Sequence, residues 1–288
     1  MREFDYSSIC EKLLTPEIRK LLDEIHEEEK QLNAFLTKQS EGFSLLSEKA
    51  EKESIATSNA LEQIRVTPER LDEILKTDTP LLTDNERSIA GYRDAFRTVT
   101  ESYDAIPVTA SVILQLHRDL YRYMGYGGGC FKTGDNVIRE QDSQGNQMIR
   151  FRPVSAWETP AYVVNICVAF EKVTEKDTCD PLLRIPVFIL DFLCVHPFDD
   201  GNGRTSRILT ALLLYQAGCF VGMYSGMDRM IEKYKDGYYE SLQRSSENWH
   251  EGENDYGPFA RHILQVLLET CMECRKVLQN ESKKYEKR

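Results

Sequence analysis

The residues whose types and spacing favour chemistry lie between His196 and Arg207, in the run His-Pro-Phe-Asp-Asp-Gly-Asn-Gly-Arg-Thr-Ser-Arg. Gly201, Asn202 and Gly203 tolerate positive φ angles, so their backbone N–H groups can converge into an anion-binding nest. This nest leads directly into a predicted helix, whose N-terminal N–H groups and dipole favour a bound phosphate. The segment therefore predicts a phosphate-binding loop.

Two arginines follow the glycines. Arg204 and Arg207 are three residues apart and share one helix face, where two guanidinium groups can clamp further phosphates. Basic side chains in a first helical turn oppose the helix dipole, so the pair favours a bound polyphosphate.

A carboxylate and an imidazole flank this site. Asp200 lies beside the nest, and Mg²⁺ is commonly held by one or two carboxylates together with substrate phosphates. His196 ends an apolar segment and can accept a proton near neutral pH. Taken singly, such a His, a Gly-Asn-Gly turn and an Arg-x-x-Arg pair are common in structural positions. In this order they predict a nucleotide site with a base, although neither GxxxxGK[ST] nor a GxGxxG after a strand occurs.

The elements that must position these residues are mainly helices. Helical periodicity and capping residues predict helices at 15–36, 46–65, from 68, 83–103, from 107, from 159, 182–195, 205–217, 227–248 and 257–280. The segment 182–195 is apolar enough to be the buried central helix. Strands at Val137–Gln141 and Gln147–Phe151, with a turn at Ser143–Asn146, predict one β-hairpin.

Composition narrows the class of protein. The chain has 288 residues and a net charge of −11, which argues against a general nucleic-acid or anionic-membrane binder. It has no run of eighteen apolar residues and no apolar stretch at its start, which predicts a cytoplasmic location. The eight cysteines are therefore expected as reduced thiols. A zinc or redox site at the single pair Cys271-x-x-Cys274 is the alternative.

The pattern His-Pro-Phe-x-Asp-Gly-Asn-Gly-Arg-x-x-Arg resembles the signature of Fic domain proteins, and residues 196–207 match every specified position. Gly129-Cys130-Phe131-Lys132, with Lys132 where the family usually has Arg, the hairpin and Arg152-Pro153 are similar to further family segments. The resemblance implies a mainly α fold: a Fic-type helical core over 105–275 with one β-hairpin flap, a preceding N-terminal helical region over 1–104 and a frayed charged tail over 276–288.

The resemblance also implies an activity: Mg²⁺-dependent transfer of AMP from ATP to a Ser, Thr or Tyr hydroxyl of a target protein. His196 would take the proton from that hydroxyl, and Asp200 would hold Mg²⁺. Gly201, Asn202 and Gly203 would cradle the phosphates. Arg204 would bind the β-phosphate and Arg207 the γ-phosphate.

Two segments outside the loop would complete the substrate sites. Asp236-Gly237-Tyr238-Tyr239 resembles the family's tyrosine-rich segment, which places Tyr238 and Tyr239 near an adenine pocket. The hairpin residues Val137, Ile138 and Arg139 would form a target-docking flap that pairs with an extended segment of the target. A plain surface hairpin is the alternative.

An inhibitory element is expected in the N-terminal region. Ser58-Asn59-Ala60-Leu61-Glu62-Gln63 resembles the family's Ser/Thr-x-x-x-Glu-Gly/Asn pattern, in a helix over about 48–65. Glu62 would pair with Arg207 and obstruct the γ-phosphate site, with Ser58 on the same helix face. Gln63 departs from the pattern, which predicts a different helix end and a weaker brake. An ordinary glutamate on a solvated helix face is the alternative for Glu62.

Other functions stay open at this point. They are transfer of a different nucleotide, removal of AMP with Glu62 positioning water, phosphate transfer, and a non-catalytic module that senses nucleotide. The expected partner is a protein bearing a hydroxyl, with self-modification as an option and no nucleic acid or membrane. The sequence leaves the oligomeric state open.

Overall fold

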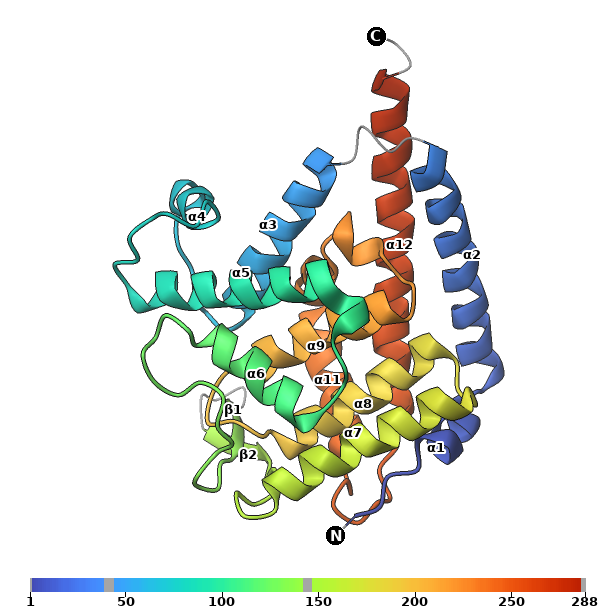
Figure 1. Cartoon of the computed structure of the whole chain (residues 1–288). Coiled ribbons are helices and arrows are strands. Elements are labelled where there is room, and N and C mark those ends of the chain that lie inside the picture. The colour runs from blue at the N-terminus through green and yellow to red at the C-terminus, as the bar shows by residue number, and fades with distance from the viewer. Residues whose placement is uncertain (1, 39–43, 142–146, 286–288) are drawn as a thin grey trace.

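The computed structural model describes residues 2–38, 44–141 and 147–285, and it is mainly helical (Figure 1). The longer helices pack around the apolar helix α8, and two short strands form a hairpin at one side of the molecule. The elements are α1 (Tyr6–Leu13), α2 (Pro16–Lys38), α3 (Ser44–Leu61), α4 (Pro68–Ile74), α5 (Asp84–Ser102), η2 (Tyr103–Ala105), α6 (Ala110–Leu120), β1 (Ile138–Gln141), β2 (Gln147–Phe151), α7 (Thr159–Lys176), α8 (Pro181–Val195), α9 (Asn202–Gln216), η3 (Val221–Met223), α10 (Met227–Lys233), α11 (Lys235–Ser246) and α12 (Gly257–Tyr285).

Capping side chains explain where several helices begin. The Thr83 side chain accepts a hydrogen bond from the backbone N–H of Glu86, as its capping pattern predicts. The helix expected from residue 107 begins at Ala110, because the side chain of Thr109 caps it by accepting from Val112 N–H. The sequence did not predict α1, and the single helix expected over 227–248 is divided at Tyr234 into α10 and α11.

The central helix is α8, and its prediction from the sequence is confirmed. From Leu182 to Val195 all its side chains except that of Arg184 are buried. The helices α7, α9, α11 and α12 pack around it, so one hydrophobic core includes residues from both the predicted N-terminal region and the predicted Fic core. The helix ends at His196, which takes the left-handed conformation with φ 48° and thereby turns the chain into the candidate loop.

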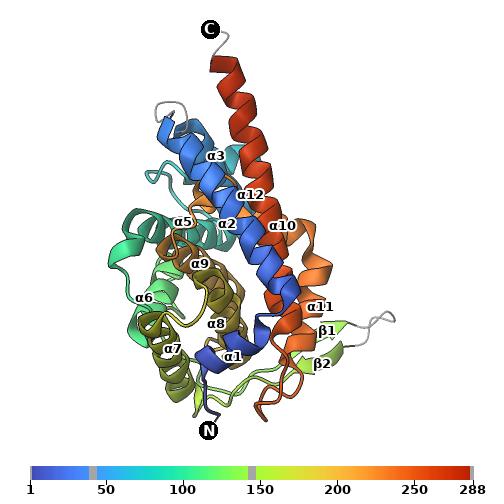
Figure 2. The same ribbon diagram turned by 90° about the vertical axis from the view of Figure 1, so that its right-hand side faces the viewer.

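The N-terminal helices pack against the far end of the chain. Figures 1 and 2 show α2 running alongside α12, while α1 lies beside α7 and α8. This packing brings Cys10 of α1 to Cys179, just before α8, and the two form a disulfide with a Cα–Cα distance of 5.7 Å. The expectation that all eight cysteines are thiols is therefore wrong for this pair, whose sequence separation of 169 residues hides the contact.

The hairpin matches the predicted pairing. β1 and β2 are antiparallel, with Arg139 opposite Ile149 and Ile138 opposite Phe151, so Arg150 is the extra residue of a β-bulge. The predicted turn at Ser143–Asn146 lies outside the described residues. At the other end of the chain α12 continues to Tyr285, within the segment 276–288 that we expected to fray. Among the described helices none is long and apolar enough to cross a bilayer.

Candidate active site

The loop between α8 and α9 is fixed from inside the core. Phe198 is fully buried, and its ring stacks on the imidazole of His117 with a centroid distance of 3.6 Å. The side chain of Asn202 accepts a hydrogen bond from Phe198 N–H at 3.0 Å and donates to Phe198 C=O at 2.8 Å. Phe198 therefore anchors the loop in the core. The Asn202 side chain is already engaged in holding the loop, so only its backbone N–H remains a candidate phosphate ligand.

Gly201 has to be glycine for two reasons. Its φ is +82°, in the left-handed region that side chains disfavour, and it immediately precedes α9. A Cβ at this position would also lie 2.9 Å from the Tyr121 ring and 3.2 Å from His117 Nε2. The packing of His117 and Tyr121 against this turn therefore requires glycine at position 201, the same residue type that the anion-binding nest requires.

His196 is held as a neutral imidazole with one nitrogen left to act as a base. Its Nδ1 lies 3.3 Å from the carbonyl oxygen of Leu193, to which the Nδ1–H tautomer donates. Burial, reinforced by the positive charge of Lys132, lowers the pKa of His196 to about 4. At neutral pH the Nε2 lone pair is therefore available to accept a proton.

Lys132 stands where the family that this chain resembles usually has arginine, and it bonds the backbone on both sides of His196. Its ammonium donates to the carbonyl oxygen of Val195 at 3.1 Å and to Asn136 Oδ1 at 3.0 Å. Its backbone N–H donates to the carbonyl oxygen of Pro197 at 2.9 Å. Burial lowers the pKa of Lys132 to about 8. These bonds hold the backbone next to His196 in place, so the ammonium group of lysine is sufficient here and the bidentate guanidinium of an arginine is not required.

Asp200 and Arg204 form an ion pair at 3.4 Å, and both also contact Tyr121, a residue that the sequence did not single out. The Tyr121 hydroxyl donates to Asp200 Oδ2 at 2.6 Å and accepts from Arg204 Nη2 at 3.0 Å. Loss of solvent opposes ionisation of Asp200, but the hydrogen bonds from Tyr121 and Gly201 N–H and the charge of Arg204 lower its pKa. Asp200 is therefore an ionised carboxylate at neutral pH.

His117 is a second missed residue. Gly129 N–H donates to His117 Nδ1 at 3.1 Å, so the proton of the neutral ring is on Nε2, which donates to the carbonyl oxygen of Asp200 at 3.0 Å. Burial lowers the pKa of His117 to about 4, which keeps the ring neutral. His117 and Tyr121 are four residues apart at the C-terminal end of α6, so their spacing was the available signal that both face the loop.

Arg207 meets the end of α3, as predicted. Arg207 Nε donates to Ser58 Oγ at 2.6 Å, and Nη2 donates to Ser58 C=O at 2.8 Å and to Glu62 Oε1 at 2.9 Å. A Cβ on Gly203 would lie 2.2 Å from Glu62 Oε1, so the carboxylate rests directly against the start of α9. Glu62 therefore occupies space beside the nest that a phosphate on Arg207 would need.

The helix that carries Ser58 ends earlier than expected. α3 covers Ser44–Leu61 instead of 48–65, so Glu62 is the first residue after the helix. Gln63 has φ 62°, its N–H donates to Ala60 C=O, and Ile64 N–H donates to Asn59 C=O. This is a Schellman ending, in which glycine or asparagine is favoured at the position that Gln63 occupies.

The loop, α3, α11 and the hairpin enclose a cavity of about 480 Å³. Its walls include Glu62, His196, Gly203, Arg207, Tyr238 and Tyr239, so the predicted base, phosphate site and adenine-pocket tyrosines share one space. Of the three predicted flap residues, Ile138 and Arg139 line the cavity and Val137 does not. Arg150 also lines it, because the bulge in β2 turns this residue toward Tyr239, whose ring centroid is 5.7 Å from the guanidinium carbon.

The donor set fits a metal that is bound mostly by substrate. Among the described residues no group of three or more His, Cys, Asp or Glu side chains is placed to hold a metal ion. Asp200 is an ionised carboxylate that directly precedes the nest, and Mg²⁺ is commonly held by one or two carboxylates plus phosphate oxygens. The residues present therefore fit Mg²⁺ that arrives with a nucleotide.

Several known proteins are similar to this chain in sequence and in fold. The Fic/DOC family pattern matches residues 107–214, which include the whole candidate loop. A Fido domain-containing protein of Dictyostelium discoideum is 30% identical over 118 residues, which are 40% of this chain and 80% of that protein. The chain belongs to the Fic/DOC family. A probable protein adenylyltransferase of Aquifex aeolicus is 21% identical over 187 residues, covering 64% of this chain and 54% of that relative.

The fold of the family extends over nearly the whole molecule. A crystal structure of a Fic family protein from Desulfovibrio desulfuricans G20 matches with a TM-score of 0.74 and 20% identity, over 92% of this chain and 75% of that one. This confirms the predicted mainly helical Fic fold with a small hairpin. The chain spans about half the length of the Aquifex relative.

Proposed function

We propose that this Fic protein transfers AMP from ATP to a hydroxyl group of a protein, and that its resting form is inhibited by Glu62. The observation that carries the proposal is a neutral His196 in the same cavity as Gly203 and Arg207, at the N-terminus of α9. A base beside a built anion site is what nucleotidyl transfer to a neutral hydroxyl requires.

The transfer step follows from the position of His196. The oxygen of a target Ser, Thr or Tyr attacks the α-phosphorus, the bond from that phosphorus to the bridging oxygen breaks, and pyrophosphate leaves. His196 Nε2 accepts the hydroxyl proton as the new bond forms. The hydrogen bond from Nδ1 to Leu193 C=O keeps the ring oriented and stabilises the imidazolium that results.

The start of α9 binds the phosphates. Backbone N–H groups of Gly201–Gly203 and the helix dipole face the anion, Arg204 binds the β-phosphate and Arg207 the γ-phosphate. Arg204 Nε is buried and has no hydrogen-bond partner among the described residues, which leaves one donor available beside the site. Asp200 would hold Mg²⁺, which supplies charge neutralisation on the phosphates when bound.

Inhibition follows from the shared use of Arg207. Arg207 Nε and Nη2 donate to Ser58 and Glu62, and the Glu62 carboxylate adds negative charge where the γ-phosphate belongs. The Glu62 side chain is 36% exposed, so it can rotate toward solvent at modest cost. ATP then binds fully only in the fraction of molecules in which Glu62 has moved away.

The substrate protein and the setting belong to the same proposal. An extended target segment pairs with the hairpin at Val137–Arg139 and presents its hydroxyl to His196, and the protein itself serves as one target. The helical region 1–104 acts as the regulatory part and 105–275 as the catalytic part. A cytoplasmic location stays a prediction, and the Cys10–Cys179 disulfide stands against it because disulfides are rare in reducing compartments.

Intact-mass spectrometry tests the function. The wild type and the variants Glu62→Gly, His196→Ala and Glu62→Gly/His196→Ala are each incubated with ATP and Mg²⁺. We expect added AMP on Glu62→Gly, little on the wild type and none on either His196 variant. Absence of AMP on every variant, although ATP binds, would overturn adenylyl transfer.

Two further experiments distinguish adenylyl transfer from the alternative reactions, which are transfer of another nucleotide and removal of AMP. Parallel incubations with GTP, CTP and UTP show whether another nucleotide is transferred. Modified Glu62→Gly protein, freed of ATP, is then mixed with unmodified wild type. Loss of its AMP would identify removal as the main reaction, which the presence of Glu62 and His196 in one cavity would allow.

A further inference from the structure

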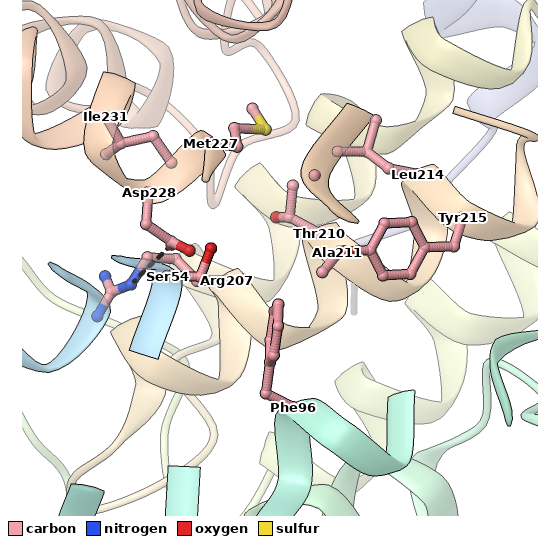
Figure 3. A pocket seen from close by; sticks show the side chains of 11 residues that line it. Ser54, Phe96, Arg207, Thr210, Ala211, Leu214, Tyr215, Met227, Asp228 and Ile231 are labelled. Carbon is pink, nitrogen blue, oxygen red and sulfur yellow. Dashed lines mark ion pairs between the residues drawn. The ribbon is translucent and has the colours of Figure 1, made fainter. Parts of the chain in front are cut away.

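Arg207 has partners on two sides, and only one side belongs to the inhibitory segment. Ser58 and Glu62 contact it from α3 and the residue after it. From α10, Asp228 Oδ1 lies 3.8 Å from Arg207 Nε, and Figure 3 shows its carboxylate pointing at that group. Among the described residues these are the two carboxylates within ion-pair distance of Arg207.

The two carboxylates differ in where they lie relative to the nucleotide cavity. Glu62 lines it and fills the space beside Gly203. Asp228 instead lines a small apolar pocket behind Arg207, together with Phe96 and Met227 (Figure 3). A phosphate that enters the cavity therefore has to displace Glu62, whereas Asp228 can keep its place.

Asp228 is also held independently of Glu62. Its side chain is only 10% exposed, and the Ser54 hydroxyl, which lines the same pocket, helps to lower its pKa. Burial raises its pKa to about 6, against the opposing effects of Arg207 and Ser54, so the carboxylate is mostly ionised at pH 7.5 to 8. The guanidinium of Arg207 is 6% exposed, and a charge so deeply buried needs a partner of opposite sign.

We infer that Asp228 is a positioning residue that holds Arg207 in place for the γ-phosphate once Glu62 has moved away. This rests on the proposed function, in which Arg207 binds that phosphate. Ser58 still offers a hydroxyl and a carbonyl to Arg207, but both are neutral. Asp228 then supplies the negative charge that keeps the guanidinium from withdrawing, without competing for the face that meets ATP.

Calorimetric titration of Glu62→Gly protein with MgATP and with AMP at pH 7.5 tests this, because AMP has no γ-phosphate. Adding Asp228→Asn should weaken MgATP binding about tenfold, a loss near 1.4 kcal/mol, and leave AMP binding within about twofold. Asp104→Asn, which removes the same charge from an exposed position in η2, should change neither. Unchanged AMP binding shows that the variant is folded.

The outcomes separate the two proposals. If Glu62→Gly protein binds MgATP no better than AMP, the proposed γ-phosphate site is wrong and the role of Asp228 falls with it. If it prefers MgATP and Asp228→Asn keeps that preference, only the inference about Asp228 is wrong. Activation of the wild type by Asp228→Asn with unchanged ATP affinity would contradict the inference, because it would show that Asp228 holds α3 in the inhibitory position.

Should Asp228→Asn fail to fold, Ser54→Ala in the same Glu62→Gly protein answers the question. It removes only the hydroxyl that orients the carboxylate, and we expect MgATP binding to weaken about threefold with AMP binding unchanged. Equal MgATP affinity in the two proteins would contradict the inference.

Discussion

The two sides of the nucleotide cavity are built differently. On the α8–α9 side, Phe198, His117 and Asn202 hold the loop through buried stacking and hydrogen bonds. On the α3 side, the contact with Arg207 depends on a half-exposed Glu62 and on a helix end with Gln63 in a left-handed conformation. The first side is held by buried contacts and the second by a partly exposed one. Under the proposed function, a change on the second side can therefore alter inhibition without disturbing the base.

The largest expected effect breaks the catalytic side. In the Glu62→Gly background, His196→Ala should reduce the rate of AMP transfer about 10³-fold, because the base that takes the hydroxyl proton is lost. Calorimetry should give an unchanged ATP affinity, since the phosphate ligands are other residues. A rate within about tenfold of the parent would show that another group is the base.

The ionisation of His196 is a second way to examine that side. Its pKa of about 4 keeps the ring neutral down to about pH 5, whereas hydrogen bonds to Asp180 and Glu29 raise the pKa of His26, outweighing its burial. In an NMR pH titration, with His196→Ala for assignment, the two imidazole signals should therefore move on opposite sides of pH 6.5. A midpoint for His196 at or above 6.5 would contradict the closed environment described for it.

Tyr121→Phe should have a smaller effect. It removes the hydroxyl that joins Asp200 to Arg204, while the ring keeps its packing. We expect kcat/KM for ATP to fall about tenfold in Glu62→Gly protein, the size typical of groups that orient ligands. Tyr126→Phe is the matched control, because Tyr126 is 67% exposed. Equal losses in the two variants would remove Tyr121 from the site.

Gln63→Gly addresses the α3 side and should have the smallest effect. Glycine tolerates a φ of 62°, so the free energy of unfolding should rise by about 0.5 to 1 kcal/mol. A firmer end to α3 should also lower the basal transfer rate about threefold. Thr77→Gly relieves a φ of 67° after α4 and should stabilise the protein with no change in rate. A higher basal rate in Gln63→Gly would contradict the proposed brake geometry.

The sequence predicted the α8–α9 side better than the α3 side. The motif from His196 to Arg207 and the apolar run of α8 are local signals. α8 had the predicted form, whereas α9 begins at Asn202, three residues before the predicted start, because Gly201 in the left-handed conformation directly precedes it. His117 and Tyr121, which hold the loop, lie at the C-terminal end of α6 more than seventy residues earlier, and their spacing of four residues shows a shared face but not which loop it meets.

Three further features were not predicted from the sequence, because each depends on packing or on backbone geometry. The disulfide joins residues 169 positions apart, and its formation depends on how α1 packs. The bulge that turns Arg150 toward the cavity is a property of strand pairing, which alternating polarity does not encode. The early end of α3 is a backbone hydrogen-bond motif that forms around Gln63 despite its side chain.

The central claim is that Glu62 and the γ-phosphate compete for Arg207. Its most direct test is the initial rate of AMP incorporation at one subsaturating ATP concentration for the wild type, Glu62→Gln and Glu62→Gly. Loss of the Glu62 charge should raise the rate about 10- to 100-fold in both variants, as expected if about 1 to 10% of the wild type is open. Equal rates in all three proteins would contradict the claim and leave Glu62 as an ordinary surface contact of Arg207.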